Sequence, residues 1–480
     1  MATYPDWVEC HRLHGKEIKR FGDRFYLYEY KTVWNKESHK PQKLSGACIG
    51  RITEKGLITS TPRNRTPVPS IPVQVLEYGA SKFLVQMSED IRTLLEQHFP
   101  QHWKDIYVTA LLRTITPQPF KRIQDRYERS WLSMEYPDIF FSKNSITRLL
   151  NTVGGMREQM VRFMRSLFGE GRYLLFDGTT ITTFSKGIEG AAVGYSSTQS
   201  WDPQMNLMYV FRCGNDPAPV FFRTSSGDVR DVALFRQVIE ETELTTMVVV
   251  ADKGFASEEN FSFLAKENMH YIVPLKRSST KYDRIAFTLP GKTGFPQCFL
   301  FNNRPIWCRN EAKDGYRIIT YIDGELRLHE EKDFLRRMLN KQDGYDHEQL
   351  VSREPLFGSF VLQTDLTESM EEIYRLYKQR GEIEQSFDHL KNNLEQDNSY
   401  MQTREGFETW CFLNHVSMLL VYRIFNVLKK AGLIDRYSTR DMLDLFSGIK
   451  KVRIAGTWVN SIVTKNTLKL AEELGFKVET

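Results

Sequence analysis

The chain has 480 residues, of which 41% are apolar and 26% are charged. This composition is that of an ordinary globular protein, and it excludes wholesale disorder and a fibrous repeat. Because a single hydrophobic core stops growing well below this length, we expect about two to four structural units. Lys and Arg outnumber Asp and Glu by only 65 to 60, so the overall charge does not identify a nucleic-acid partner.

Cysteine usage and apolar segments indicate a protein of the reducing cytoplasm. The six cysteines are scattered with no C-x2-C pair, which argues against a zinc site or a disulfide framework. The chain opens without an apolar stretch of signal-peptide length, so the sequence predicts a cytoplasmic location. The most apolar segment, residues 411–428, is interrupted by Asn414, His415 and Arg423, and we expect a buried helix rather than a membrane span.

Residues 1–75 are predicted to form a β-hairpin region followed by a proline-rich linker. Within residues 24–58, β-favouring runs flank the polar sequence NKESHKPQK, a pattern typical of a hairpin with a long loop. Four prolines follow between residues 62 and 72, a density that disfavours helix and favours an extended linker.

Residues 76–168 show apolar residues at helical spacing and are predicted to form a helical domain. Two interpretations of its basic residues stay open, because they fit either a DNA-binding domain or the solvated faces of a helical bundle. The residues concerned are Arg113, Lys121, Arg122, Arg126, Arg129 and Arg148.

The rest of the chain divides into four segments by pattern. Residues 169–275 alternate strand-like apolar runs with helical segments, which predicts an α/β layer structure around a buried mixed sheet. Residues 276–366 suggest short antiparallel strands around turns, and we interpret them as a β-rich insertion. A long helix is expected within residues 367–400, and residues 401–480 are predicted to be helical.

Two aspartates stand at the ends of apolar, strand-like runs. Asp177 follows YLLF and Asp252 follows MVVVA, so both are expected where buried strands emerge at an edge of the sheet. Functional groups collect at such edges in open α/β sheets. The alternative is that each aspartate is only a turn or helix-cap residue after a strand.

A third carboxylate lies on the predicted long helix. Tyr377, Arg380, Glu384 and Lys391 stand at offsets 0, 3, 7 and 14, which at about 100° per residue share a stripe roughly 60° wide. Carboxylates beside cations and a phenol suit phosphodiester cleavage, in which two Mg²⁺ ions activate a water and stabilise the leaving oxygen. Mn²⁺ is expected to substitute for Mg²⁺.

These four residues match the pattern Y-x2-R-x3-E-x6-K, and the chain resembles the DDE transposases of bacterial insertion sequences, in the insertion-sequence-four-like group that this signature defines. The D-G-T context of Asp177 and the D-x-G-F context of Asp252 resemble the family's first and second aspartates. The matching region covers roughly residues 172–400, and the 132 residues between Asp252 and Glu384 (384 − 252) leave room for the family's insertion.

The resemblance implies an RNase H-like mixed-sheet core, interrupted by a β-rich insertion and flanked by helical N- and C-terminal regions. It implies a transposase that binds transposon ends, cleaves them by metal-dependent hydrolysis and joins the 3′-hydroxyl ends to target DNA. Asp177, Asp252 and Glu384 would be the catalytic carboxylates and the ligands of two Mg²⁺ ions.

The resemblance also implies DNA contacts and partners. Tyr377, Arg380 and Lys391 would contact phosphates near the cleaved end, at the terminal inverted repeats of the element. Trp307 is the candidate for stacking on a flipped base, with a buried core tryptophan as the alternative. The resemblance further implies a homodimer that acts on paired transposon ends and on double-stranded target DNA. It implies a location in the prokaryotic cytoplasm, in association with the nucleoid, and no membrane partner.

Three other functions compete with transposition as interpretations of this sequence. An RNase H-like endonuclease that cuts without joining strands would use the same metal chemistry. A transposase-derived DNA-binding protein without activity is disfavoured by the presence of all three carboxylates. A glycosidase with a carboxylate pair would not need Tyr, Arg and Lys on the face of the glutamate's helix.

Overall fold

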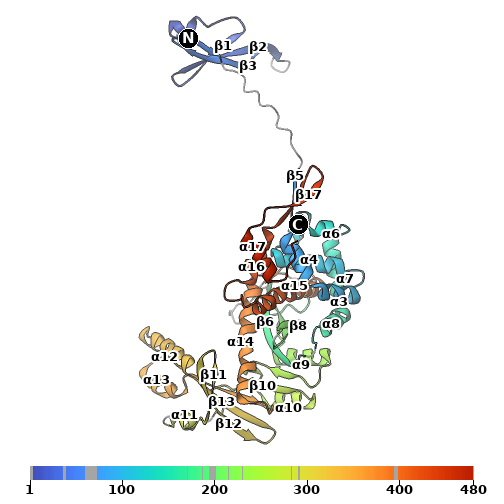
Figure 1. The fold of residues 1–480 in the computed structure, drawn as a ribbon, viewed down its shortest axis with the longest axis vertical. Helices are drawn as coiled ribbons and strands as arrows, with labels where there is room; N and C mark the ends of the chain where they lie inside the picture. The colour runs from blue at the N-terminus through green and yellow to red at the C-terminus, as the bar shows by residue number, and fades with distance from the viewer. Residues whose placement is uncertain are drawn as a thin grey trace. The chain divides into compact units, whose positions relative to one another are not determined.

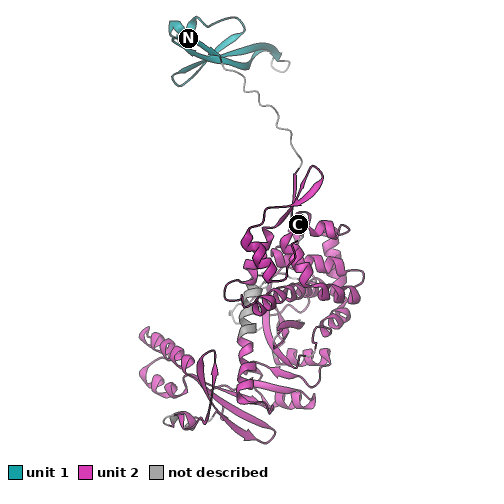
Figure 2. Ribbon diagram, in the orientation of Figure 1, with its two compact units in different colours: residues 1–72 teal, residues 73–480 magenta. Residues whose placement is uncertain are grey.

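The computed structural model describes residues 4–35, 39–59, 73–169, 171–185, 187–193, 202–214, 216–229, 231–282, 284–289, 292–393 and 398–478. Inside the described helices and strands, side chains are left undescribed at positions 231, 285, 288, 382–393 and 398. The chain separates into two compact units, residues 1–72 and residues 73–480 (Figure 2).

The first unit is a four-stranded antiparallel sheet with one short helix. Its strands are paired in chain order, and β2 and β3 are the two long ones, forming a hairpin. Val8 of the helix packs on Phe25, Leu27 and Ile52 of the sheet, and these four residues form a small separate core. The elements are α1 (Asp6–Glu9), β1 (Lys16–Phe21), β2 (Arg24–Asn35), β3 (Lys40–Thr53) and β4 (Gly56–Thr59). The proline-rich segment predicted after them falls mostly on residues 60–72, which lie outside the described residues.

The second unit begins with short helices that pack around the long helix α15 (Arg404–Lys430). α4 is buried over most of its length, and its Arg113 donates hydrogen bonds to Gln118 O at 2.9 Å and Asn414 Oδ1 at 2.8 Å. One of the basic residues of this region is therefore a buried structural residue. The helices are α2 (Gly79–Met87), α3 (Glu89–His98), α4 (Trp103–Ile115), α5 (Ile123–Glu128), α6 (Leu132–Glu135), α7 (Lys143–Gly154) and α8 (Arg157–Arg165).

A large mixed sheet forms the centre of the second unit (Figure 1). β7 pairs antiparallel with β6 on one side, and β8 pairs antiparallel with β7. On the other side of β6, β9 and then β10 follow in parallel. The helices α9 (Asp231–Thr242) and α10 (Glu258–Lys266) connect β8 to β9 and β9 to β10. The strands are β6 (Tyr173–Thr183), β7 (Gln204–Arg212), β8 (Ala218–Ser226), β9 (Val248–Val250) and β10 (His270–Pro274).

Helices cover both faces of this sheet. On one face Phe176 of β6 meets Phe235 of α9, with ring centroids 4.8 Å apart. On the other face Tyr209 of β7 stacks on His415 of α15 at 6.2 Å. The apolar composition of the strands thus reflects burial on both sides, as expected for a sheet between two helical layers.

The segment predicted as a β-rich insertion extends the same sheet. Its last strand, β14, pairs antiparallel with β10, and β13, β12 and β11 follow outward. The segment was predicted to consist of short strands around turns, but it also contains helices, and the sequence GELRL begins α12. Asp323 caps this helix by accepting from the N–H groups of Glu325 and Leu326, and strong helix formers follow it. The elements are α11 (Ile285–Thr288), β11 (Gln297–Phe301), β12 (Arg304–Lys313), β13 (Tyr316–Asp323), α12 (Gly324–Leu339), α13 (His347–Arg353) and β14 (Ser359–Thr364).

The C-terminal region, predicted as helical, also contains a β-hairpin. β16 and β17 are joined by a two-residue turn at Ala455 and Gly456, whose positive φ angles of 48° and 93° are typical of tight hairpins. β16 also pairs with β5 (Val73–Glu77), which spans the predicted boundary between the linker and the helical domain at residue 75. The paired residues are 373 to 381 positions apart (450 − 77 and 454 − 73), so no local sequence pattern indicates the pairing. The other elements are α14 (Met370–Asn393), β15 (Asn398–Ser399), α16 (Thr439–Ser447), β16 (Lys450–Ile454), β17 (Thr457–Asn460) and α17 (Lys465–Glu473).

Helix α15 is the one described helix long and apolar enough to cross a membrane, and 83% of its most apolar window is buried inside the protein. Its neighbours include α4, α7 and β8. Burial of this extent is that of a core helix, as the polar interruptions in its sequence indicated.

Two adjacent glycines at the end of α7 test how tightly α15 is packed. A Cβ at Gly154 would lie 2.0 Å from the backbone oxygen of Glu405, whereas a Cβ at Gly155 would have nothing nearer than 3.6 Å. We expect Gly154→Ala to lower the free energy of unfolding by about 1–3 kcal/mol, since the helix backbones must separate. Gly155→Ala should change it by less than about 0.5 kcal/mol. Equal unfolding midpoints in urea for both variants would contradict this packing.

Candidate active site

The register between β6 and β9 brings the two predicted aspartates together. The strands are parallel neighbours, and Leu175 of β6 stands opposite Val250 of β9. Asp177 and Asp252 each come two residues later, so both lie beyond the same end of β9. Because side chains alternate along a strand, Asp177 lies on the face of Leu175, and Asp252 stands just past the end of the neighbouring strand β9.

Asp177 lies inside its strand, whereas the sequence suggested that it ended one. β6 continues to Thr183, because β7 pairs with it along this whole stretch and β15 joins it at Thr182 and Thr183. The residue opposite Asp177 on β7 is Tyr209, and paired residues project to the same face. Asp177 is half-buried, while Tyr209 is fully buried.

Asp252 acts both as a cap residue and as an ion-pair partner. Its Oδ1 accepts from the N–H of Lys253 at 2.6 Å, which caps the short 3-10 helix Lys253–Phe255. The same oxygen lies 3.1 Å from Nη1 of Arg380. The side chain of Asp252 remains 46% exposed, so it is open to solvent as well as held by these contacts. The alternative of a cap residue is therefore compatible with a functional role.

Helix α14 carries the residues of the signature and packs against both β6 and β9. Arg380 is largely buried, with 14% of its side chain exposed, and it reaches Asp252 from this helix. Tyr377 lies one turn earlier, and its ring stacks on Phe360 of β14 with centroids 5.9 Å apart. Glu384 and Lys391 lie further along the same helix, but their side chains are outside the described residues.

The structure therefore brings Asp177 and Asp252 to the same end of β9, with Arg380 of α14 paired to Asp252. Glu384 lies one helical turn beyond Arg380, which places its backbone on the part of α14 that follows the contact with Asp252.

The donor chemistry of the site fits a divalent metal. Asp177 and Asp252 supply hard carboxylate oxygens, the ligands that Mg²⁺ and Mn²⁺ prefer. Asp252 already has a cation beside it, and within the described residues both contacts of its side chain use Oδ1. No group of three His, Cys, Asp or Glu side chains that could hold a metal occurs among those described, a set that excludes Glu384. Among the described side chains, the agreement with a divalent metal site therefore rests on Asp177 and Asp252 alone.

The structure places Trp307 in a small apolar cluster of the insertion. It lies on β12 between Cys298 and Ile322 of the neighbouring strands, and it is half-buried. It packs against the cluster of Ala286, Phe295 and Ile322. This position supports the interpretation of Trp307 as a core residue of the insertion.

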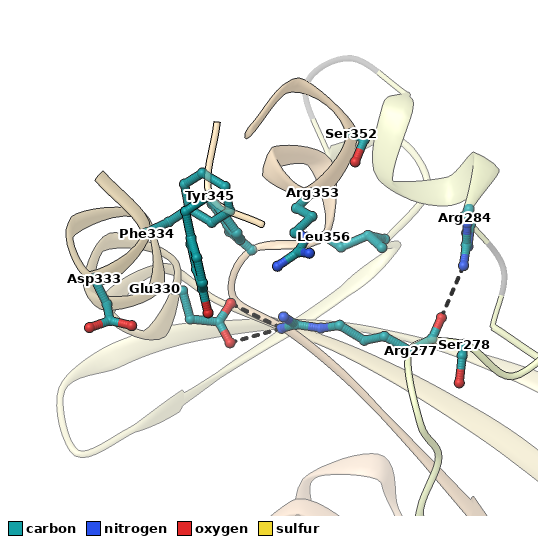
Figure 3. A pocket seen from close by; sticks show the side chains of 11 residues that line it. Arg277, Ser278, Arg284, Glu330, Asp333, Phe334, Tyr345, Ser352, Arg353 and Leu356 are labelled. Carbon is teal, nitrogen blue, oxygen red and sulfur yellow. Dashed lines mark hydrogen bonds and ion pairs between the residues drawn. The ribbon is translucent and has the colours of Figure 1, made fainter. Parts of the chain in front are cut away.

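The insertion also contains a pocket of about 510 Å³ that is distinct from the aspartates (Figure 3). Arg277 reaches across it and donates to both oxygens of Glu330, each at 2.9 Å. It also donates to the backbone oxygen of Ser359 at 2.7 Å. These contacts give Arg277 a structural role, because it joins the middle of α12 to the start of β14.

A buried aromatic layer behind Asp177 could not be found from the sequence. Burial raises the pKa of Tyr209 well above its usual range, so this phenol stays protonated beside Asp177. Its ring stacks on His415, and burial lowers the pKa of His415 to about 3, so the imidazole is neutral at physiological pH. The sequence signal was the polar interruption at His415; the pairing of Tyr209 with Asp177 depends on strand register alone.

Comparison with known families finds a match to the transposase DDE domain over residues 169–420, slightly more than half of the chain. The matched range starts just before β6 and ends within α15. It therefore contains Asp177, Asp252 and Glu384 together with the whole insertion. No curated protein matches the chain.

The neutral state of His415 predicts a pH dependence of stability. Its folded pKa of about 3 lies below the ordinary value of 6.5, so the unfolded chain binds the extra proton between these values. The contribution of the neutral His415 to the free energy of unfolding should be fully present above about pH 6.5 and should be lost as the pH drops toward 3. In His415→Phe, which keeps a buried ring, the difference between the melting temperatures at pH 7 and pH 5 should shrink. The exposed His347→Phe is the control and should keep the wild-type difference, whereas an unchanged difference in His415→Phe would contradict this prediction.

Proposed function

Because this chain belongs to the transposase DDE-domain family, we propose that it is a cut-and-paste DNA transposase of the insertion-sequence-four-like group. It binds transposon-end DNA, cleaves it by metal-dependent hydrolysis and joins the 3′-hydroxyl ends to target DNA. The family itself implies an enzyme of transposition with DNA as its partner. The observation that carries the finer proposal is the parallel register that sets Asp177 beside Asp252, with α14 packed across both strands.

The strand order supports an RNase H-like core. Three antiparallel strands, β8, β7 and β6, are followed in the sheet by two parallel ones, β9 and β10, each reached through a helix. In this arrangement the insertion follows β10 in the chain and returns through β14 to α14. A long insertion therefore fits between Asp252 and Glu384 without separating the helix from the two strands.

Asp177, Asp252 and Glu384 are the proposed ligands of two Mg²⁺ ions, for which Mn²⁺ substitutes. When bound, the ions supply activation of a water and stabilisation of the leaving oxygen of the phosphodiester. The protein's own contribution is positioning. The cap interaction with Lys253 fixes the carboxylate of Asp252, and the buried layer of Tyr209 and His415 supports the strand that carries Asp177.

The cations of α14 are proposed to hold the DNA. Arg380 offsets the charge of Asp252 in the absence of DNA, and its guanidinium is suited to phosphate oxygens near the cleaved end. Tyr377 and Lys391 would contact the same phosphate backbone. We propose action as a homodimer on paired terminal inverted repeats and on target DNA, in the prokaryotic cytoplasm in association with the nucleoid.

The second candidate is an endonuclease that cuts without joining, because the same carboxylates and metals would serve it. A DNA-binding descendant without catalytic activity is disfavoured, since the sequence contains all three carboxylates, Asp177, Asp252 and Glu384. Strand joining is the activity that separates the first candidate from both.

The test uses a labelled duplex carrying the terminal repeat that flanks the protein's own gene, with Mg²⁺. We expect Asp177→Asn, Asp252→Asn and Glu384→Gln each to lower cleavage and joining by at least about 100-fold while keeping DNA binding, because each removes a metal-binding charge. Glu382→Gln is the matched control: it lies on the same helix, about 170° from the centre of the stripe, and should retain activity.

Cleavage without joining by the wild-type protein would favour the endonuclease. Full activity in all three carboxylate variants would show that the active site lies elsewhere.

A further inference from the structure

The positive charge of the protein is concentrated in its first unit. Residues 1–72 contain 13 Lys and Arg against 7 Asp and Glu, a net charge of +6. The whole chain has a net charge of +5, so residues 73–480 together carry −1. A partner attracted by positive charge would therefore be drawn to this small β-sheet rather than to the larger unit.

Part of this sheet projects as a two-stranded ribbon. β1 pairs with residues 24–29 of β2, and β4 pairs with residues 50–53 of β3. Beyond these limits β2 and β3 pair only with each other, down to Asn35 opposite Lys40. We call residues 31–35 and 40–45 the ribbon; they belong to the long β2–β3 hairpin labelled in Figure 1.

The ribbon is exposed on both faces within the first unit. All its residues are exposed except Asn35, which is half-buried. Trp34 is 60% exposed, and Val33 and Leu44 are 46% and 50% exposed. Strands of this length usually bury one face, so a ribbon that buries neither has the character of a surface for a partner.

The polar side chains of the ribbon are of the kinds that proteins use to contact DNA. By the strand register, one face carries Thr32, Trp34, Pro41 and Lys43, and the other carries Lys31, Val33, Asn35, Lys40, Gln42 and Leu44. Asn35 donates to Gln42 Oε1 at 3.1 Å, so the two amides lie side by side. No acidic residue occurs at the described positions 30–35 and 39–50.

We propose that the ribbon enters the major groove of duplex DNA and provides recognition of the DNA by this protein. The major groove is wide enough to admit a two-stranded β-ribbon. Lys31, Lys40 and Lys43 would contact phosphates, while Asn35 and Gln42 would face base edges, which amide side chains read by paired hydrogen bonds. This inference rests on the proposed function, because it takes DNA as the substrate.

Duplex DNA fits the ribbon better than a single strand. Proteins that bind single strands stack bases on open aromatic rings. Here Lys43 Nζ lies 3.9 Å from the ring centroid of Tyr30, and Lys19 Nζ lies 4.9 Å from that of Tyr28. The rings of Tyr28 and Tyr30 are thus already covered by cations, which remain available to phosphates, and Trp34 is left as the exposed aromatic side chain of the ribbon.

The experiment measures binding of the full-length protein to a 40-base-pair duplex and to a single strand of equal length, in EDTA and over a range of salt concentrations. We expect Lys31→Gln, Lys40→Gln and Lys43→Gln together to weaken duplex binding by about 10- to 100-fold and to lower the slope of log K against log salt by about 2–3. The triple Lys→Arg variant, which keeps the charge, should bind like the wild type.

A second triple, Lys16→Gln, Arg24→Gln and Lys55→Gln, removes the same charge from the first unit outside the ribbon and should leave the salt slope within about 1 of wild type. Asn35→Ala with Gln42→Ala should keep the salt slope but lose most of the preference for the protein's own terminal repeat over random duplex.

Equal weakening by both triples, or unchanged binding by the ribbon triple, would overturn the proposal. So would tighter binding of the single strand that depends on the ribbon lysines. Failure of the proposed function would look different: the wild type would bind duplex through the ribbon but would not cleave it in Mg²⁺.

Discussion

The parallel pairing of β6 with β9 is the constraint on which the site depends. It sets Asp177 and Asp252 at equal distances beyond a registered pair, Leu175 and Val250. Because side chains alternate along a strand, a slip of one residue would turn one carboxylate to the opposite face of the sheet. Burial of both faces of β9, and the pairing of β6 with β7 along its length, make such a slip costly.

The two aspartates have buried, uncharged neighbours on one side and a positively charged neighbour on the other. Behind Asp177 lie Tyr209 and the neutral His415, which burial keeps uncharged. From α14 comes Arg380, whose guanidinium balances Asp252. Without a cation nearby, the two carboxylates would repel each other. Either the guanidinium of Arg380 or a bound metal ion can supply the positive charge that offsets this repulsion.

Local sequence patterns predicted the features that local physics controls. The apolar strands before Asp177 and Asp252, the helix that carries Tyr377 and Arg380 and the burial of α15 all follow from periodicity and composition. The continuation of β6 past Asp177, the joining of β14 to β10 and the pairing of β5 with β16 depend on partners distant in sequence. Helix α12 was missed although its cap residue, Asp323, stands in the sequence, because the preceding strand pattern was extended through it.

The proposed role of Asp177, Asp252 and Glu384 is to hold divalent metal ions together. Anomalous diffraction from crystals of the protein bound to its terminal repeat and soaked in Mn²⁺ would test this role. We expect anomalous peaks between the carboxylates of Asp177 and Asp252, with Glu384 completing the coordination, and the loss of these peaks in Asp252→Asn. Mn²⁺ bound only elsewhere, with these carboxylates unoccupied in an otherwise active complex, would contradict it.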